Sequence, residues 1–202
     1  MRSTLIQAPQ RDALDILSEV KPHLRVELSD QEEDLLLQAY VAAARMHAEA
    51  FTHRQLIDAT WEVWLDRFPE CDLIELPFPP LKTVTSVKYL DSSGVEQTLS
   101  TALYSVSAPT GPYAQPGRII LKYGEIWPVT QPVPEAVRIR FTAGYGANSD
   151  SVPDGIRAGM LLHVGELYAH REDAIAGTSV QPVPRGVDAA LWPYRTWIRQ
   201  AS

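Results

Sequence analysis

Apolar residues recur at helical spacing in two separate segments, one toward each end of the chain. The first segment predicts a helix over residues 30–51, and its apolar stripe consists of Leu36, Tyr40, Ala43, His47 and Ala50. Capping-box spacing, Ser29 with Glu32 or Asp30 with Glu33, favours this start. A shorter helix is expected near residues 17–24, where Pro22 lacks the backbone donor that a helix interior needs.

The second helical segment begins at Pro153, a residue that suits the first turn of a helix. It extends to about residue 171, and its apolar stripe consists of Ile156, Met160, His163, Val164, Leu167 and Tyr168. A loop is expected over residues 173–186, because glycine and proline recur there. Asp188 then caps a final short helix, which Pro193 interrupts.

Between these segments the period changes to two. Ile57, Ala59, Trp61, Val63 and Leu65 alternate with mostly polar residues, which predicts a half-buried strand over residues 56–65. Further short strands are expected at residues 74–76, 84–90, 95–99, 104–107, 118–123 and 137–142. Residues 91–94 form the turn of a hairpin. We expect antiparallel pairing, in a sheet or a barrel, because no crossover helix separates the strands.

The distribution of proline supports this division. No proline occurs from His23 to Phe68 or from Asp154 to Gln181, and no glycine precedes Gly94. Because proline breaks helix interiors, the ends of the chain permit helices and the middle does not. We therefore predict an α+β fold, a small helical bundle from both chain ends with an antiparallel β-rich insertion. In this interpretation residues 1–202 form a single domain, with a helical core over 12–54 and 152–200 and the insertion over 55–148.

Composition narrows the class of protein. The chain has 202 residues and a formal net charge of −7, with 18 Lys and Arg against 25 Asp and Glu. This balance argues against a protein that binds nucleic acid through a broad basic surface. No run of about 18 apolar residues occurs, so we expect no membrane span. Cys71 is the single cysteine, which excludes an intramolecular disulfide and a cysteine-based zinc site.

Sequence patterns for catalysis or metal binding are weak. His47 and His53, like His163 and His170, lack the i, i+4 spacing of a helical metal pair. The segment from Gly144 to Gly146 lacks the ending of a phosphate-binding loop and is typical of a tight turn after a strand. We therefore predict no catalytic residue, no metal site and no cofactor.

The end of the sequence is rich in aromatic residues. Trp192, Tyr194 and Trp197 lie beside Arg195 and Arg199. Aromatic and arginine side chains are typical of the centres of protein interfaces. The same composition also fits a segment that folds back onto its own core, and the sequence leaves both interpretations open.

Several segments, taken in order, resemble one family. They are residues 17–26, the Ala-rich helix with its acidic start, and residues 54–63, 74–89, 137–146, 152–153, 168–172 and 184–195. This order resembles the head-to-tail connector (adaptor) proteins of tailed phages, which also occur in gene transfer agents. The resemblance extends from Ile16 to Arg195, and it depends on the order of the segments rather than on one diagnostic motif.

The resemblance implies a non-enzymatic structural protein of the virion, located at the head-tail junction and in the host cytoplasm during assembly. Such proteins form a homo-oligomeric ring beneath the portal protein, expected to be twelve-fold to match it. The ring extends the channel through which double-stranded DNA passes without specific binding, and it offers a surface to tail or stopper proteins. An acidic chain without a basic stripe suits such a channel.

Two hypotheses about contact residues follow. The first is that residues 187–197 dock on the portal, through Val187, Leu191, Trp192, Tyr194, Arg195 and Trp197. Deletion of everything after Gly186 should then abolish portal binding and leave the monomer folded. The second is that the slim helix packs between ring subunits through Leu36, Tyr40, Ala43 and His47.

Other classes of protein remain open at this point. One is a non-catalytic, β-rich accessory module that binds a small ligand or a peptide. Another is an enzyme whose active site forms only in three dimensions. The sequence specifies neither the number of subunits, nor the face that lines the channel, nor the protein that docks below the ring.

Overall fold

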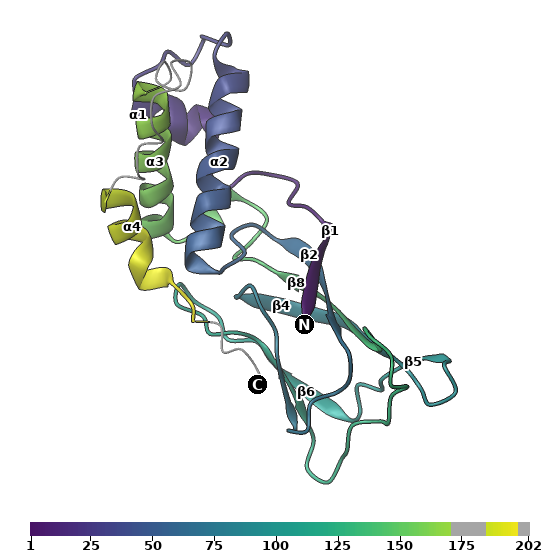
Figure 1. The fold of residues 1–202 in the computed structure, drawn as a ribbon. Helices are drawn as coiled ribbons and strands as arrows, with labels where there is room; N and C mark the ends of the chain where they lie inside the picture. Colours follow the sequence, from purple (N-terminus) through teal and green to yellow (C-terminus); the bar gives the residue numbers. More distant parts are fainter. Residues whose placement is uncertain (171–184, 198–202) are drawn as a thin grey trace. The chain divides into compact units, whose positions relative to one another are not determined.

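The computed structural model describes residues 1–170 and 185–197 of the chain as two compact units (Figure 1). The first, called the β-rich unit, consists of Met1–Pro9 and Asp58–Tyr145. The second, called the helical unit, consists of the described residues of Gln10–Ile57 and of the segment from Gly146 onward. The chain therefore has an α+β fold, as the sequence predicts. Residues 1–9 of the β-rich unit lie outside the range 55–148 that was expected for the insertion.

Five strands form the larger sheet of the β-rich unit, in the spatial order β1-β2-β8-β4-β5. They are β1 (Arg2–Gln7), β2 (Ala59–Leu65), β4 (Leu81–Leu90), β5 (Glu96–Thr98) and β8 (Val137–Ala143). The smaller sheet has the order β3-β7-β6. Its strands are β3 (Leu73–Glu75), β6 (Tyr104–Ser107) and β7 (Arg118–Leu121). All these strands pair antiparallel, which confirms the predicted pairing.

The core of the β-rich unit follows the alternation that the sequence shows. Val137, Ile139 and Phe141 of β8 are completely buried, whereas the residues between them are less so. Val63 of β2 lies in the same core, with Trp61 packed against it. Alternate residues of a strand point to opposite faces, so this set defines the inner face of the central strands.

Strand β1 is a part of the sheet that the sequence pattern does not predict. It pairs with β2 through a register that shifts between Leu5 and Gln7, and all six of its residues are exposed. A strand without a buried face has no hydrophobic alternation to detect. Its place at the sheet edge comes from pairing with β2 and from the ion pair of Arg2 with Glu135, at 2.9 Å.

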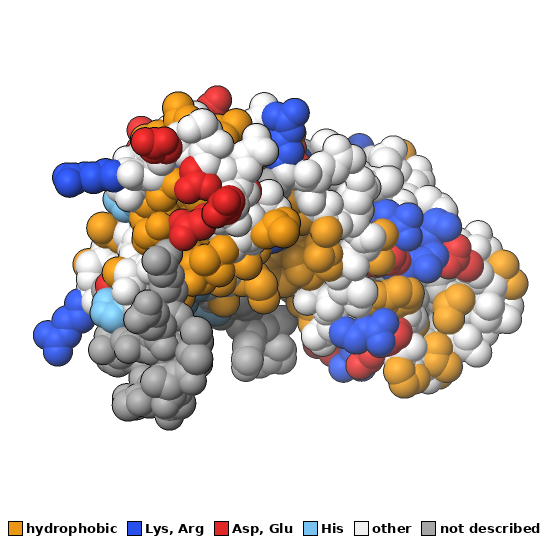
Figure 2. Space-filling model, turned by 90° about the horizontal axis from the view of Figure 1, so that it is seen from above, with side chains coloured by type: hydrophobic (Ala, Val, Ile, Leu, Met, Phe, Trp, Pro, Cys, Tyr) orange, Lys and Arg blue, Asp and Glu red, His pale blue; other side chains and the backbone are white. Residues whose placement is uncertain are grey.

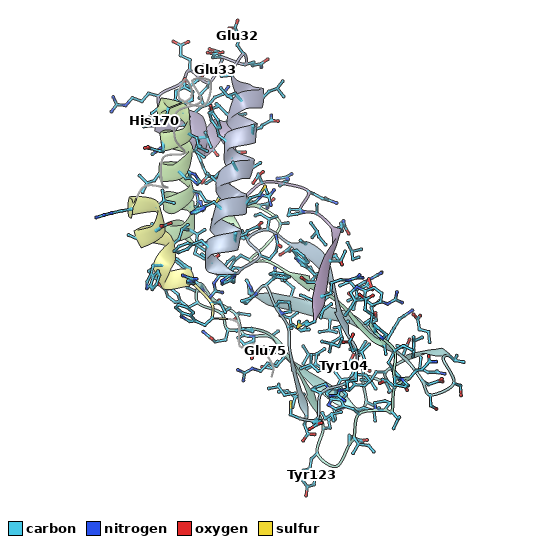
Figure 3. The ribbon with its side chains drawn as sticks, in the orientation of Figure 1. Glu32, Glu33, Glu75, Tyr104, Tyr123 and His170 are labelled. Atoms are coloured by element: carbon cyan, nitrogen blue, oxygen red, sulfur yellow. The ribbon has the colours of Figure 1, made fainter. Side chains whose placement is uncertain are left out.

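The helical unit has two long helices, α2 (Asp34–Thr52) and α3 (Asp154–Ala169), which lie side by side in Figure 1. Figure 3 shows Glu33, before the start of α2, and His170, after the end of α3, at the same end of the unit. The hydroxyl of Tyr168 donates a hydrogen bond to Glu33 Oε2 at 2.6 Å. The two helices therefore run antiparallel.

Shorter helical elements complete this unit. They are the π-helical turn η1 (Ile16–Val20), α1 (Lys21–Leu24), the 3-10 turn η2 (Ser149–Ser151), α4 (Arg185–Leu191) and the 3-10 turn η3 (Trp192–Tyr194). Pro22 lies in the first turn of α1, where its missing N–H breaks no helical hydrogen bond. The predicted helix at 17–24 is confirmed. α4 begins before Asp188, which therefore does not cap it, and most of the expected loop 173–186 lies outside the described residues.

Helix α2 begins at Asp34, four residues later than predicted. Lys21 is completely buried, and its ammonium group donates hydrogen bonds to the carbonyl oxygens of Leu28 and Asp30 and forms an ion pair with the carboxylate of Asp34. These bonds hold residues 28–30 outside the helix. Asp30 accepts a hydrogen bond from the backbone N–H of Glu32 at 3.0 Å, which makes a local turn rather than the predicted capping box.

The buried face of α2 differs from the stripe that the spacing suggests. The buried residues follow the members of that stripe by one or two positions in the sequence. They are Leu37, Val41, Ala44, Ala48 and Thr52. Leu36 and Ala43 are exposed, and Tyr40 and His47 are partly buried. The predicted stripe therefore borders the core of the helical unit and reaches solvent.

The turn after β8 has the structure expected of the segment from Gly144 to Gly146. Gly144 has a φ of +142°, and a Cβ on it would lie 2.5 Å from the backbone nitrogen of Asp58. Glycine is therefore required by both conformation and space. None of the described helices is long and apolar enough to cross a membrane.

Candidate functional site

The aromatic segment at the end of the chain is fixed to α3 by buried apolar residues. Val187 and Leu191 of α4 are completely buried. Two glycines of α3 allow this close packing. A Cβ on Gly159 would lie 3.2 Å from Leu191 Cδ2, and a Cβ on Gly155 would lie 2.4 Å from the hydroxyl oxygen of Tyr194.

The same segment is tied to the end of α2 by hydrogen bonds to its backbone. The N–H of Thr196 donates to the carbonyl oxygen of Thr52 at 2.9 Å. Nε of Arg54, a residue that is itself buried, donates to the carbonyl oxygen of Tyr194. Residues 194–196 therefore have a fixed position at the junction of α2 and α3 rather than a frayed one.

Large aromatic side chains emerge from this fixed segment into solvent. Trp192 is 57% exposed and Trp197 is 68% exposed, and their ring centroids lie 6.3 Å apart. Phe51 of α2 lies 6.3 Å from Trp192. The guanidinium carbon of Arg195 lies over all three rings, at 5.3 Å from Phe51, 5.6 Å from Trp192 and 4.8 Å from Trp197. We call these four residues the aromatic platform.

The structure separates the six predicted portal-contact residues into two groups. Trp192 and Trp197 are exposed, and Arg195 is partly exposed, with its guanidinium over both rings. Val187 and Leu191 are buried in the helical unit itself, so the surface offered to a partner does not include them. Tyr194 is partly buried against Gly155.

This burial corrects the expectation that the tail can be deleted without loss of the fold. Removal of everything after Gly186 would uncover the core that Val187 and Leu191 fill on α3. It would also leave the carbonyl oxygen of Thr52 without its bond from Thr196. Point substitutions on the exposed rings are therefore the sharper test of the platform.

Phe51 is the platform residue that the sequence does not single out. It lies at the end of α2, four residues after His47, with the two rings stacked at 6.0 Å. The available signal is its i, i+4 position relative to His47, which places both side chains on one side of the helix. The contact of Phe51 with Arg195 could not be predicted from local patterns, because the two residues are far apart in the sequence.

A small titratable cluster lies beside the platform, between α2, α3 and α4. His47 Nε2 lies 3.5 Å from Asp188 Oδ1, and the rings of His47 and His163 meet edge to face at 5.0 Å. Burial, and then the nearby His47, lower the pKa of His163, while Asp188 and Glu166 act in the opposite direction. The described residues contain no group of three or more His, Cys, Asp or Glu side chains that could hold a metal ion.

The outward side of α2 forms a second candidate surface, which we call the α2 face. Its exposed positions are Leu35, Leu36, Gln38, Ala39, Ala43, Met46 and Ala50. Leu35 is 80% exposed and Met46 is 65% exposed, and no charged residue belongs to this set. Figure 2 shows hydrophobic side chains next to acidic ones over the helical unit. Contiguous exposed apolar surface of this kind is typical of protein interfaces.

Comparison with known proteins gives a family match over part of the chain. Residues 15–104 match the sequence model of the family described as phage gp6-like head-tail connector proteins. The resemblance inferred from the order of sequence segments is confirmed. This match supports a structural connector role.

Solved structures extend the likeness to the whole chain. A chain in the virion of a native gene transfer agent particle is 26% identical, with a TM-score of 0.77, and the match covers 100% of this chain and 99% of that one. The same values describe a chain in the neck of the empty particle, computed with C6 symmetry. A third chain, from the neck of the native particle computed with C12 symmetry, is 23% identical with a TM-score of 0.73 and shows the shared fold. No curated protein gave a significant match.

Proposed function

We propose that this connector forms a homo-oligomeric ring in the neck of a phage or gene transfer agent particle. In this proposal the ring lies beneath the portal protein, extends the DNA channel and offers a docking surface to a tail or stopper protein. The observation that carries the proposal is the full-length likeness to chains of a gene transfer agent particle and its neck. The protein then works in the virion, after assembly in the host cytoplasm.

The α2 face supports the ring. A closed ring needs heterologous contacts, in which one surface of a subunit meets a different surface of its neighbour. An uncharged face on a 19-residue helix can bury apolar side chains such as Leu35 and Met46 without burying a charge. The likeness to a chain of a neck computed with C6 symmetry supports a ring, and we propose twelve subunits, which would match the portal.

The aromatic platform supports contact with the portal. Exposed tryptophans beside an arginine have the composition of an interface hot spot. The backbone bonds of Thr196 and Tyr194 fix the platform in advance, so docking loses little conformational entropy. We therefore assign Trp192, Arg195 and Trp197 to the portal-facing surface.

The charge of the chain supports passage of DNA without retention. A net charge of −7 repels the phosphate backbone instead of neutralising it. In a ring of such subunits, duplex DNA finds few cationic partners. The channel wall would then let DNA slide during packaging and ejection.

Reconstitution with purified portal protein tests this proposal. The full-length chain is mixed with portal rings, and the complex is analysed by mass photometry and cryo-electron microscopy. We expect a connector ring with the rotational symmetry of the portal. A chain that stays monomeric alone and still forms this ring agrees with the proposal, whereas absence of portal binding at micromolar concentrations contradicts it.

The platform is tested by the single substitutions Trp192→Ala and Trp197→Ala. Hot-spot truncation typically costs at least about 2 kcal/mol of binding free energy, so each should weaken portal binding about 30-fold. Tyr113→Ala, at an exposed aromatic residue of the β-rich unit, is the matched control and should bind as the wild type does. Unchanged binding by both tryptophan variants would remove the platform from the interface.

A further inference from the structure

Arg195 has an unusual environment for an arginine of this protein. In the helical unit, Arg45 pairs with Asp12 at 2.8 Å and Arg157 pairs with Glu19 at 2.5 Å. The partners of the Arg195 guanidinium are instead three aromatic rings, Phe51, Trp192 and Trp197. Within residues 1–170 and 185–197, none of the ion pairs includes Arg195.

The rings leave the hydrogen-bonding edge of the guanidinium without an acceptor. A guanidinium meets aromatic rings through its flat face, and its N–H groups point outward in the plane of the group. Nε of Arg195 is buried and, within the described residues, has no hydrogen-bond partner. A buried donor without a partner carries a desolvation cost, which a ligand with a suitable acceptor would remove.

The shape of that edge selects the acceptor. The N–H groups of a guanidinium form a rigid fork that matches the two oxygens of a carboxylate. Trp192 and Trp197 are exposed beside this guanidinium and would contact apolar groups next to that carboxylate. Exclusion of water by the tryptophans would strengthen the charge-assisted hydrogen bonds.

We propose that Arg195 binds the carboxylate of an Asp or Glu side chain that lies in an apolar segment of the portal protein. This inference rests on the proposed role of the aromatic platform as the portal-docking surface and adds the chemistry of its partner. The aromatic rings hold the guanidinium in place before binding, so an acidic portal side chain meets a fixed fork. The pair then sets the register of docking, while the tryptophans supply most of the buried area.

Equilibrium binding of full-length variants to purified portal rings tests the proposal. Arg195→Gln removes the charge, and Arg195→Lys keeps the charge but loses the fork. We expect both variants to bind at least about 30-fold more weakly, because truncation of one partner of a buried charge pair has that effect. Arg185→Gln is the matched control. It makes the same change at an exposed arginine of α4, and wild-type affinity is expected.

A charge reversal identifies the partner side chain. Arg195→Glu should abolish binding, and an Asp→Arg or Glu→Arg substitution at one position of the portal should restore it. Circular dichroism and the thermal midpoint of each variant must match the wild type, which shows that only the surface has changed. Restoration at one portal position supports the proposal, and failure of every acidic position to restore binding overturns it.

Further outcomes separate this inference from the proposed function. If Arg195→Gln binds like the wild type while Trp197→Ala does not, the platform docks on the portal and the carboxylate partner is wrong. If all platform variants bind like the wild type, portal docking by the platform is itself wrong. If the same Arg195 variants instead lose affinity for a 30-base-pair DNA duplex, the acceptor is a phosphate and the proposal is overturned.

Discussion

The ammonium nitrogen of Lys21 lies 2.7 Å from Oδ1 of Asp34, and the Lys21 side chain is completely buried. The same ammonium group bonds two carbonyl oxygens of the connection between α1 and α2, those of Leu28 and Asp30. One buried cation therefore fixes both the path of this connection and the first residue of α2. A buried charge can do this only because several acceptors surround it.

Replacement of Lys21 by methionine should lower the stability of the helical unit. Lys21→Met keeps the apolar stem but leaves Asp34 without its ion-pair partner and two carbonyl oxygens without their donor. We expect the free energy of unfolding to fall by about 3 kcal/mol. Urea unfolding followed by far-ultraviolet circular dichroism measures this loss. Lys82→Met is the matched control, because Lys82 is exposed and its ion pair with Asp58, at 3.6 Å, is only partly buried. This variant should stay within about 1 kcal/mol of the wild type.

Glu62 gives a second prediction, for the central strands. Its buried carboxylate lies 3.1 Å from Nε of Arg138 and 3.0 Å from Nη2 of Arg140, both on the neighbouring strand β8. Glu62→Gln removes the charge that both arginines share. We expect a loss of about 2 kcal/mol in the free energy of unfolding, measured by urea denaturation.

Glu96→Gln is the control for that substitution. Glu96 also pairs with Arg138, at 2.6 Å, but its carboxylate is exposed. Surface ion pairs contribute little to stability, so this variant should lose distinctly less than Glu62→Gln. Equal losses in the two variants would show that burial does not strengthen the pair on β2.

The stability of the helical unit should depend on pH through His163. Burial and the neighbouring His47 lower the pKa of His163 below its ordinary value of 6.5. The unfolded chain then binds more protons than the folded chain between that lowered pKa and 6.5. Above pH 6.5 His163 therefore does not reduce the free energy of unfolding. Below pH 6.5 the free energy of unfolding falls as the pH decreases. Thermal midpoints measured between pH 5 and pH 8 should show this decrease.

His163→Gln should flatten that pH dependence, since glutamine does not titrate. His170→Gln is the matched control. His170 is exposed and lies just after α3, so this variant should keep the pH dependence of the wild type. If His163→Gln keeps the full pH dependence, another titratable group causes the loss of stability at low pH.

The α2 face gives a prediction about assembly. Ala43 is exposed and lies on the uncharged side of α2. Ala43→Glu should leave the monomer folded, because the new side chain points into solvent. It should prevent ring formation on the portal, because a charge would be buried between subunits. Native mass spectrometry of the portal mixture distinguishes rings from monomers. Ala102→Glu, at an exposed alanine of the β-rich unit, should form rings normally.

The periodic parts of the fold could be predicted from the sequence because their signals are local. The alternation of Val137, Ile139 and Phe141 predicts β8, and the absence of proline over residues 23–68 permits α2. The start of α2 could not be predicted, because it depends on a bond from Lys21 that precedes it in the chain. Strand β1 was missed because it buries no side chain.

The candidate site was predictable in composition and not in geometry. Trp192 and Trp197 are noticeable in the sequence, and both are exposed in the structure. The burial of Leu191 depends on Gly159, a residue of another helix. The local sequence around Leu191 therefore does not predict this contact. The contact of Arg195 with Phe51 likewise joins the two chain segments of the helical unit. Such contacts belong to the tertiary fold.

The division of the helical unit between two distant stretches of chain has a consequence for its synthesis on the ribosome. Helix α2 emerges early, but α3, which packs against it, follows only after Tyr145 has completed the β-rich unit. At roughly 5–20 residues per second, about 100 intervening residues take on the order of 5–20 seconds to translate. During that interval Leu37 and Val41 have no α3 to cover them. A nascent chain that stops within this interval therefore has a complete β-rich unit and an incomplete helical unit with exposed core residues.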